Sequence, residues 1–223
     1  DVFQVPGKRT TGTGAQTYAI TGPGWSGTLP PGMVEYKSRT GIVWLLGRIY
    51  CSGTPEDYRE VHALQDQVGL VPLSAYGRPY TPPAGQADPA IDMRTPVREQ
   101  VNRMDAVQYF TLLAELLKRN PPAPADAPAL ARFASIGLVP GQDFDASKLR
   151  ADFAGRIPQV AFDSIMVQFK INPAVRNING WAFTTKTGIY GTDYLMRALV
   201  TAIGLGANRP QDAVYPTSLK DAN

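Results

Sequence analysis

A proline- and glycine-rich stretch, YTPPAGQADP at residues 80–89, divides the chain into two parts of different character. Four of its ten residues are Pro or Gly and it has no apolar period, so it is predicted to be a linker. Twelve of the 21 glycines precede it, together with short apolar stretches typical of strands, and helical periodicity follows it. The chain is therefore predicted to be α+β. Its predicted regions are a β-rich region 1–80, a linker 81–94, a helical connector 95–209 and the start of a second β region at 210–223.

Four or five strands are predicted in the β-rich region, and three of them have clear sequence signals. QTYAIT at 16–21 is bounded by glycines, and MVEYKS at 33–38 alternates apolar and polar side chains. IVWLL at 42–46 is a continuous apolar run, which is typical of a strand covered on both faces. This region offers no evident cover for both faces of 42–46. We therefore expect partner strands from elsewhere, because an exposed apolar strand edge promotes aggregation.

One helix is predicted within the β-rich region, over residues 55–68. Thr54 is a good N-cap, Pro55 suits the first helical position, and the two acidic residues that follow favour the positive end of the helix dipole. We expect the apolar stripe of this helix to pack on the N-terminal sheet. That stripe consists of Tyr58, Val61, Leu64 and Val68.

The region after the linker is predicted to contain one long helix and several shorter ones. Thr95 is the predicted N-cap of a helix that runs to about Lys118, and Pro158 either kinks a helix that starts at Asp145 or begins a new one. Residues 177–191 are predicted to be irregular or to form a short hairpin. Further predicted helices cover residues 128–135 and 193–203, the second capped by Thr192, and a last strand is predicted from Ala213 onward.

Charge and cysteine content exclude several classes of protein. The net charge is +3, and basic residues are adjacent only at 8–9 and 118–119, whereas a phosphate-binding surface shows clustered Lys and Arg. We therefore expect no nucleic-acid partner. Cys51 is the single cysteine and cannot form an intrachain disulfide, and no apolar run reaches the roughly 18 residues of a membrane-spanning helix, so no membrane insertion is expected. With one His and one Cys, we expect no metal site, and no cofactor.

One glycine motif and one histidine are candidates for nucleotide binding and for catalysis. GPGWSG at 22–27 has the spacing of a dinucleotide-binding loop and follows a predicted strand. We interpret it as a β-turn whose glycines adopt positive φ, because Pro23 lacks an N–H and the TLPPG that follows cannot begin a helix. His62 lies at the edge of the apolar stripe of the predicted helix. We interpret it as a partly buried structural residue rather than a catalytic base.

Three blocks of sequence resemble one bacterial family. The blocks are PGKRTTGTGAQTYAITGPGWSGTLP (6–30), TPEDYREVHALQDQVGLVPLSAYG (54–77) and GIYGTDYLMRALVTAIGLGANRPQDAVYP (188–216). They are similar to proteins catalogued as domain of unknown function 1254 followed by domain of unknown function 1214. The resemblance implies two β domains of jelly-roll type joined by helices. It implies that this chain is an internal piece, with the later part of the first domain, the helical connector and the opening strand of the second.

Two classes of function fit these observations. The first is a non-enzymatic structural or assembly module, expected from a charged fraction of only 18% and from the lack of a catalytic constellation. Its partner would be the remaining parts of the same protein or another copy of it, in a homo-oligomer. The alternative is an exported enzyme or small-molecule-binding protein whose site lies partly outside this chain. Its candidate binding residues are Lys8, Arg9, Tyr190, Asp193 and Arg197.

Four of these candidates also have a simpler interpretation. Lys8 and Arg9 open the segment KRTTGTG, whose cations and hydroxyls could hold an anion but which also fits a solvated loop. Asp193 and Arg197 stand four residues apart on a predicted helix, where they would pair with each other. Since many members of the resembling family look exported, the expected location is the periplasm or the outside of the cell, with the cytoplasm as the alternative.

Overall fold

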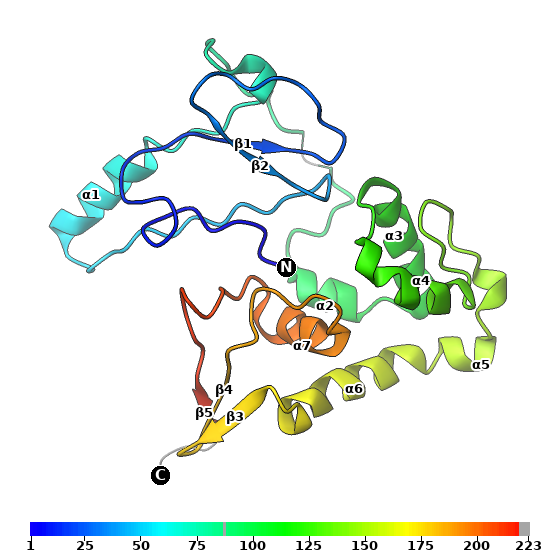
Figure 1. Ribbon diagram of the computed structural model, residues 1–223. Helices are drawn as coiled ribbons and strands as arrows, with labels where there is room; N and C mark the ends of the chain where they lie inside the picture. The colour runs from blue at the N-terminus through cyan, green and yellow to red at the C-terminus, as the bar shows by residue number, and fades with distance from the viewer. Residues whose placement is uncertain (87, 219–223) are drawn as a thin grey trace.

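The computed structural model describes residues 1–86 and 88–218. It contains helices and small sheets, which confirms the α+β class. Figure 1 shows a strand pair, a helix and a further short helical turn in the N-terminal part, and more helices with a second small sheet in the rest of the chain. The N-terminus lies between these two parts.

The N-terminal sheet consists of two parallel strands, β1 (Tyr18–Thr21) and β2 (Val34–Lys37). Both lie within predicted strands. Tyr18 is opposite Val34 in the register, and the Tyr18 and Tyr36 rings stack with their centroids 5.0 Å apart. A two-stranded sheet is marginally stable by itself, so this pair depends on contacts with other parts of the chain or with other polypeptides.

The third predicted strand, at 42–46, is not formed. This segment is extended but has no strand beside it among the described residues, and its side chains are largely open, with Ile42 65% and Leu45 60% exposed. Two contacts tie it to the helical part: the Ile42 amide donates to Asn120 Oδ1 at 3.2 Å, and the Trp44 ring lies against Gly206. A strand is defined by its pairing, and an apolar run by itself supplies no partner.

Helix α1 (Pro55–Gln65) begins as predicted. The Thr54 hydroxyl accepts a hydrogen bond from the Asp57 amide at 3.2 Å. The expected packing of its apolar side on the sheet is wrong: Tyr58 and Leu64 are about half exposed, and Val68, beyond the end of the helix, is 71% exposed. Figure 1 shows the reason, because α1 lies to the side of the strand pair instead of across its face.

The long helix predicted from Thr95 is two helices, α2 (Val97–Asn102) and α3 (Ala106–Arg119). The break occurs because Asp105 forms a new N-cap. Its carboxylate accepts from the Gln108 amide at 2.8 Å, while the Gln108 side chain accepts from the Asp105 amide at 3.0 Å. This capping box is a strong local start signal and overrides a continuous apolar stripe.

The remaining helices are short except for α6. Asp145 caps a single 3-10 turn instead of a full helix, and Pro158 lies in the first turn of α6, as one of the two predicted alternatives required. The bounds are η1 Leu73–Ala75, η2 Pro124–Asp126, α4 Ala127–Ala134, η3 Ala146–Lys148, α5 Ala151–Ala154 and α6 Ile157–Ile171.

A second sheet contains three antiparallel strands in the order β3-β4-β5: β3 (Val175–Ile178), β4 (Trp181–Thr184) and β5 (Thr217–Ser218). The hairpin between β3 and β4 turns at Asn179 and Gly180, both with positive φ, as a two-residue turn requires. The last predicted strand is confirmed at β5. It pairs with β4, whereas the sequence predicted it as the start of a separate β region. Residues 219–223 of that predicted strand lie outside the described residues.

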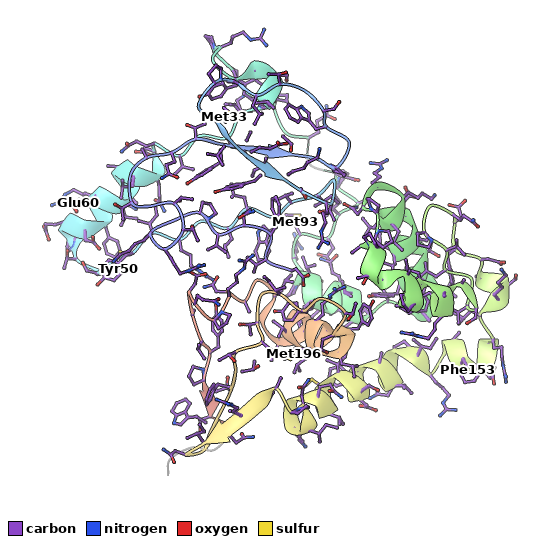
Figure 2. All side chains as sticks on the ribbon, in the orientation of Figure 1. Met33, Tyr50, Glu60, Met93, Phe153 and Met196 are labelled. Atoms are coloured by element: carbon purple, nitrogen blue, oxygen red, sulfur yellow. The ribbon has the colours of Figure 1, made fainter. Side chains whose placement is uncertain are left out.

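The main apolar core forms around α7 (Tyr194–Gly204), which Asp193 caps, one residue later than the predicted Thr192. Met196, Leu199 and Val200 are buried on this helix, and Ile165 of α6 packs against them. Figure 2 labels Met196 at the centre of this part of the molecule.

Much apolar surface stays uncovered. The accessible surface is 16677 Å², whereas a compact monomer of 24.1 kDa exposes about 10,000 Å². Tyr50, labelled in Figure 2, illustrates this at 86% exposed. The described fold therefore leaves a large apolar area without a partner.

Candidate functional site

The N-terminal segment docks on the loops that flank α7. The Val2 amide donates to the Gly188 carbonyl at 2.5 Å, and the Tyr190 amide donates to Asp1 Oδ1 at 3.2 Å. Arg209 Nη2 donates to the Val2 carbonyl at 3.3 Å. These bonds bring the first residues of the chain beside segments about 190 to 210 residues away. The predicted candidates from both ends of the chain therefore lie in one neighbourhood.

Arg9 reaches this neighbourhood through an ion pair with Asp212. Arg9 Nε and Nη2 donate to the two carboxylate oxygens of Asp212 at 2.8 and 2.7 Å. The hydrogen bond from Arg9 is the main reason why the pKa of Asp212 lies below its ordinary value, and the charge of Arg209 adds to this effect. Lys8, the neighbouring candidate, is exposed and does not line the groove described next.

Beside this ion pair lies a groove of about 290 Å³. Three cationic residues line it, from three different segments: Arg9, Lys186 and Arg209. Thr185 and Gln211 add polar side chains to the lining. The Nε atom of Arg209 is buried and has no hydrogen-bond partner. The groove is thus basic, and one of its donors is unused.

The other three predicted candidates stabilise the loop before α7. Asp193 accepts from the Met196 amide at 3.0 Å, and the Tyr190 hydroxyl accepts from the Gly188 amide at 3.0 Å. Arg197 donates to the Gly191 carbonyl and stacks 5.3 Å from the centre of the Tyr194 ring.

The predicted pairing of Asp193 with Arg197 is therefore wrong. The Asp193 carboxylate caps α7, while the guanidinium of Arg197 turns back to the loop before the helix. Both residues have structural roles in this arrangement. Arg197 Nε is also buried without a partner, so the loop retains one unused donor.

A second, apolar cavity of about 310 Å³ lies between α7 and β4. Met196, Leu199 and Phe183 supply much of its apolar wall, and Arg48 is the one charged residue in its lining. Arg48 Nη1 donates to Asn208 Oδ1 at 2.7 Å, which fixes the guanidinium there. Sequence reasoning missed Arg48, Lys186 and Arg209, because single basic residues far apart in the chain carry no local signal.

The glycine motif forms a turn, as predicted. The Trp25 amide donates to the Gly22 carbonyl at 3.2 Å, and residues 28–32 are not helical. The expected positive φ is wrong, because none of Gly22, Gly24 and Gly27 lies in the left-handed region.

His62 is exposed on α1, which corrects the expectation of partial burial. Within residues 1–86 and 88–218, no three His, Cys, Asp or Glu side chains gather into a metal-binding cluster. No helix in this part of the chain has the length and apolar character needed to cross a membrane.

Comparison with known proteins gives a match to a family model over the N-terminal part of the chain. Residues 1–72, about a third of the chain, match the family described as Protein of unknown function (DUF1254). The match supports this part of the resemblance seen in the sequence. No curated protein and no solved structure matches the chain.

Proposed function

We propose that this protein is a non-enzymatic assembly module. In this proposal its β-rich N-terminal region is completed by further strands, from the remaining parts of the same protein or from another copy, into a domain of jelly-roll type. The uncovered apolar surface carries the proposal. The total accessible surface, polar and apolar together, exceeds that of a compact monomer of this mass by roughly 6,000 Å² or more, well above the 1,200–2,000 Å² total of a standard protein–protein interface.

The position of this surface supports completion by strands. The segment 42–46 is extended and apolar, and β2 pairs on one side with β1 and on its other side with no strand among the described residues. Backbone donors and acceptors along such edges need partners, and an added strand supplies them together with apolar cover. The pair β1 and β2 alone cannot supply both the backbone hydrogen-bond partners and the apolar cover.

The test is the association state of the purified chain, together with amide hydrogen exchange across residues 40–50. The proposal expects self-association or aggregation, with fast exchange at 42–46 in any monomer. Leu45→Lys should reduce association, because it places a charge in the strand-pairing segment. Met93→Lys is the matched control, since Met93 is 87% exposed and lies in the stretch before α2. A monodisperse monomer that unfolds cooperatively would contradict the proposal.

A second candidate function is supported by the apolar cavity. A pocket of about 310 Å³ with one fixed arginine suits a small apolar molecule that carries an anionic end. We therefore keep an exported enzyme or small-molecule-binding protein as the alternative. Binding of an environment-sensitive apolar dye, reduced by Leu199→Ala or by Arg48→Gln, would favour it.

Location in the periplasm or outside the cell is part of both proposals. It is supported by the resemblance to a family with many members that look exported. Cell fractionation of the producing bacterium would test it, and recovery with the cytoplasmic fraction would contradict it.

A further inference from the structure

We infer that the basic groove between the N-terminal segment and the loops around β4 and α7 is a binding site for the oxyanion head, phosphate or carboxylate, of a small molecule. This inference is independent of the assembly proposal, because it rests on the groove alone. The residues that carry it are Lys186, Arg209 and Arg9.

The charge balance of the groove favours an anion. Arg9, Lys186 and Arg209 contribute three positive charges, and Asp212 beside them contributes one negative charge. Both oxygens of Asp212 accept from Arg9, so this carboxylate is already engaged. The groove retains an excess of two positive charges, which a phosphate group would largely balance and one carboxylate would halve.

Unused donors are available in the same place. Arg209 gives one terminal nitrogen to the Val2 carbonyl at 3.3 Å, but its Nε is buried without a partner. A buried donor without an acceptor costs free energy, and an anion is the acceptor that satisfies a guanidinium best. Lys186 adds an exposed ammonium group, and Thr185 adds a hydroxyl.

Contacts between two loops bring Lys186 and Arg209 to the same groove. The Thr187 hydroxyl donates to the Asn208 carbonyl at 2.8 Å, which ties the loop after β4 to the loop after α7. Gly188 has a φ of 85°, and a Cβ built on it would lie 3.0 Å from the backbone nitrogen of Arg209. This close approach is possible only for glycine, and it places Lys186 and Arg209 on one groove despite their mutual repulsion.

The experiment is a titration of the full chain at low ionic strength with three probes: inorganic phosphate, citrate and chloride. We expect saturable binding of phosphate or citrate and none of chloride, and the stronger of the two probes identifies the head group. Lys186→Gln should weaken binding by about tenfold, the usual effect of losing one charge-assisted hydrogen bond. Lys8→Gln is the matched control: it removes an exposed lysine next to Arg9 that does not line the groove.

Gln211→Lys provides a gain-of-binding test. It adds a positive charge to the groove lining and leaves the Arg9–Asp212 ion pair in place, so phosphate and citrate should bind more tightly, a result that misfolding cannot produce. The inference is overturned if neither anion binds saturably, or if Lys186→Gln and Lys8→Gln weaken binding equally. A folded Gln211→Lys chain that binds neither anion more tightly would also overturn it.

Discussion

Arg9 and Asp212 form a bidentate ion pair, with both nitrogen–oxygen distances below 3 Å, across 203 residues of sequence. The pair joins the N-terminal segment to the loop after α7. The hydrogen bonds of Val2 and Tyr190 lie at the same junction. The N-terminal segment and the loop after α7 are thereby held together beside a basic groove, although they belong to different predicted regions.

Acid should release this junction. The pKa of Asp212 is lowered in the folded chain, first by the hydrogen bond from Arg9, so the pair stabilises the fold above the ordinary value of 3.8. That stabilisation is lost as the pH falls through the lowered, folded-state pKa. We expect the Val2 amide to be protected from exchange, relative to its intrinsic rate at the same pH, above pH 3.8, and to lose this protection as the pH falls below that value. In Asp212→Asn this pH dependence should disappear, and persistence of the same transition in that variant would contradict the assignment.

Asp92 should titrate at an unusually low pH. Its carboxylate accepts from the amides of Arg94 and Thr95 at 2.9 and 3.0 Å, and with the Thr95 hydroxyl these bonds lower its pKa to about 2. The bonds favour the charged form, so they stabilise the turn before α2 at neutral pH and are lost as the pH falls through about 2. In Thr95→Val, carboxyl carbon shifts measured by NMR should show a pKa closer to 3.8. An unchanged value would exclude Thr95 as the main cause.

Thr54→Ala should weaken α1 locally. The variant removes the acceptor of the Asp57 amide, which costs about 1 kcal/mol of helix stability. Because the apolar side of α1 is largely exposed, the loss should appear as faster amide exchange at residues 56–58, with little change in the global unfolding midpoint. Thr28→Ala, in the exposed turn before β2, serves as control. Equal exchange rates in the two variants would count against the cap.

Two glycine substitutions should have opposite effects. Gly137 has a φ of 91°, and a Cβ there would lie 2.1 Å from the Asp145 carbonyl oxygen, so Gly137→Ala should cost at least about 2 kcal/mol. Gly24 has no positive φ and open space around it, so Gly24→Ala should be neutral or stabilise by up to about 1 kcal/mol. Denaturant unfolding of both variants tests the pair. A clear loss of stability in Gly24→Ala would show that its backbone is strained.

Local signals account for what could be predicted. Thr54 was predicted as a cap, and Pro158 as one possible helix start, because an N-cap hydroxyl and a proline act on the backbone within one turn. The break at Asp105 was missed although its signal is also local: an aspartate followed three residues later by a glutamine is a capping box. The strands 18–21 and 34–37 lie where alternation and glycine boundaries placed them.

The sequence by itself determined where most helices begin, because capping and proline geometry need no distant partner. Only the tertiary structure decided what each apolar stretch packs against. The run at 42–46 has every property of a buried strand, yet it stays open, because burial depends on a partner that the run cannot specify. The basic groove also depends on tertiary structure. Arg9, Lys186 and Arg209 lie far apart in the chain, and no local sequence pattern marks them as a site. They form one site because Thr187, Gly188 and Asp212 bring their segments together.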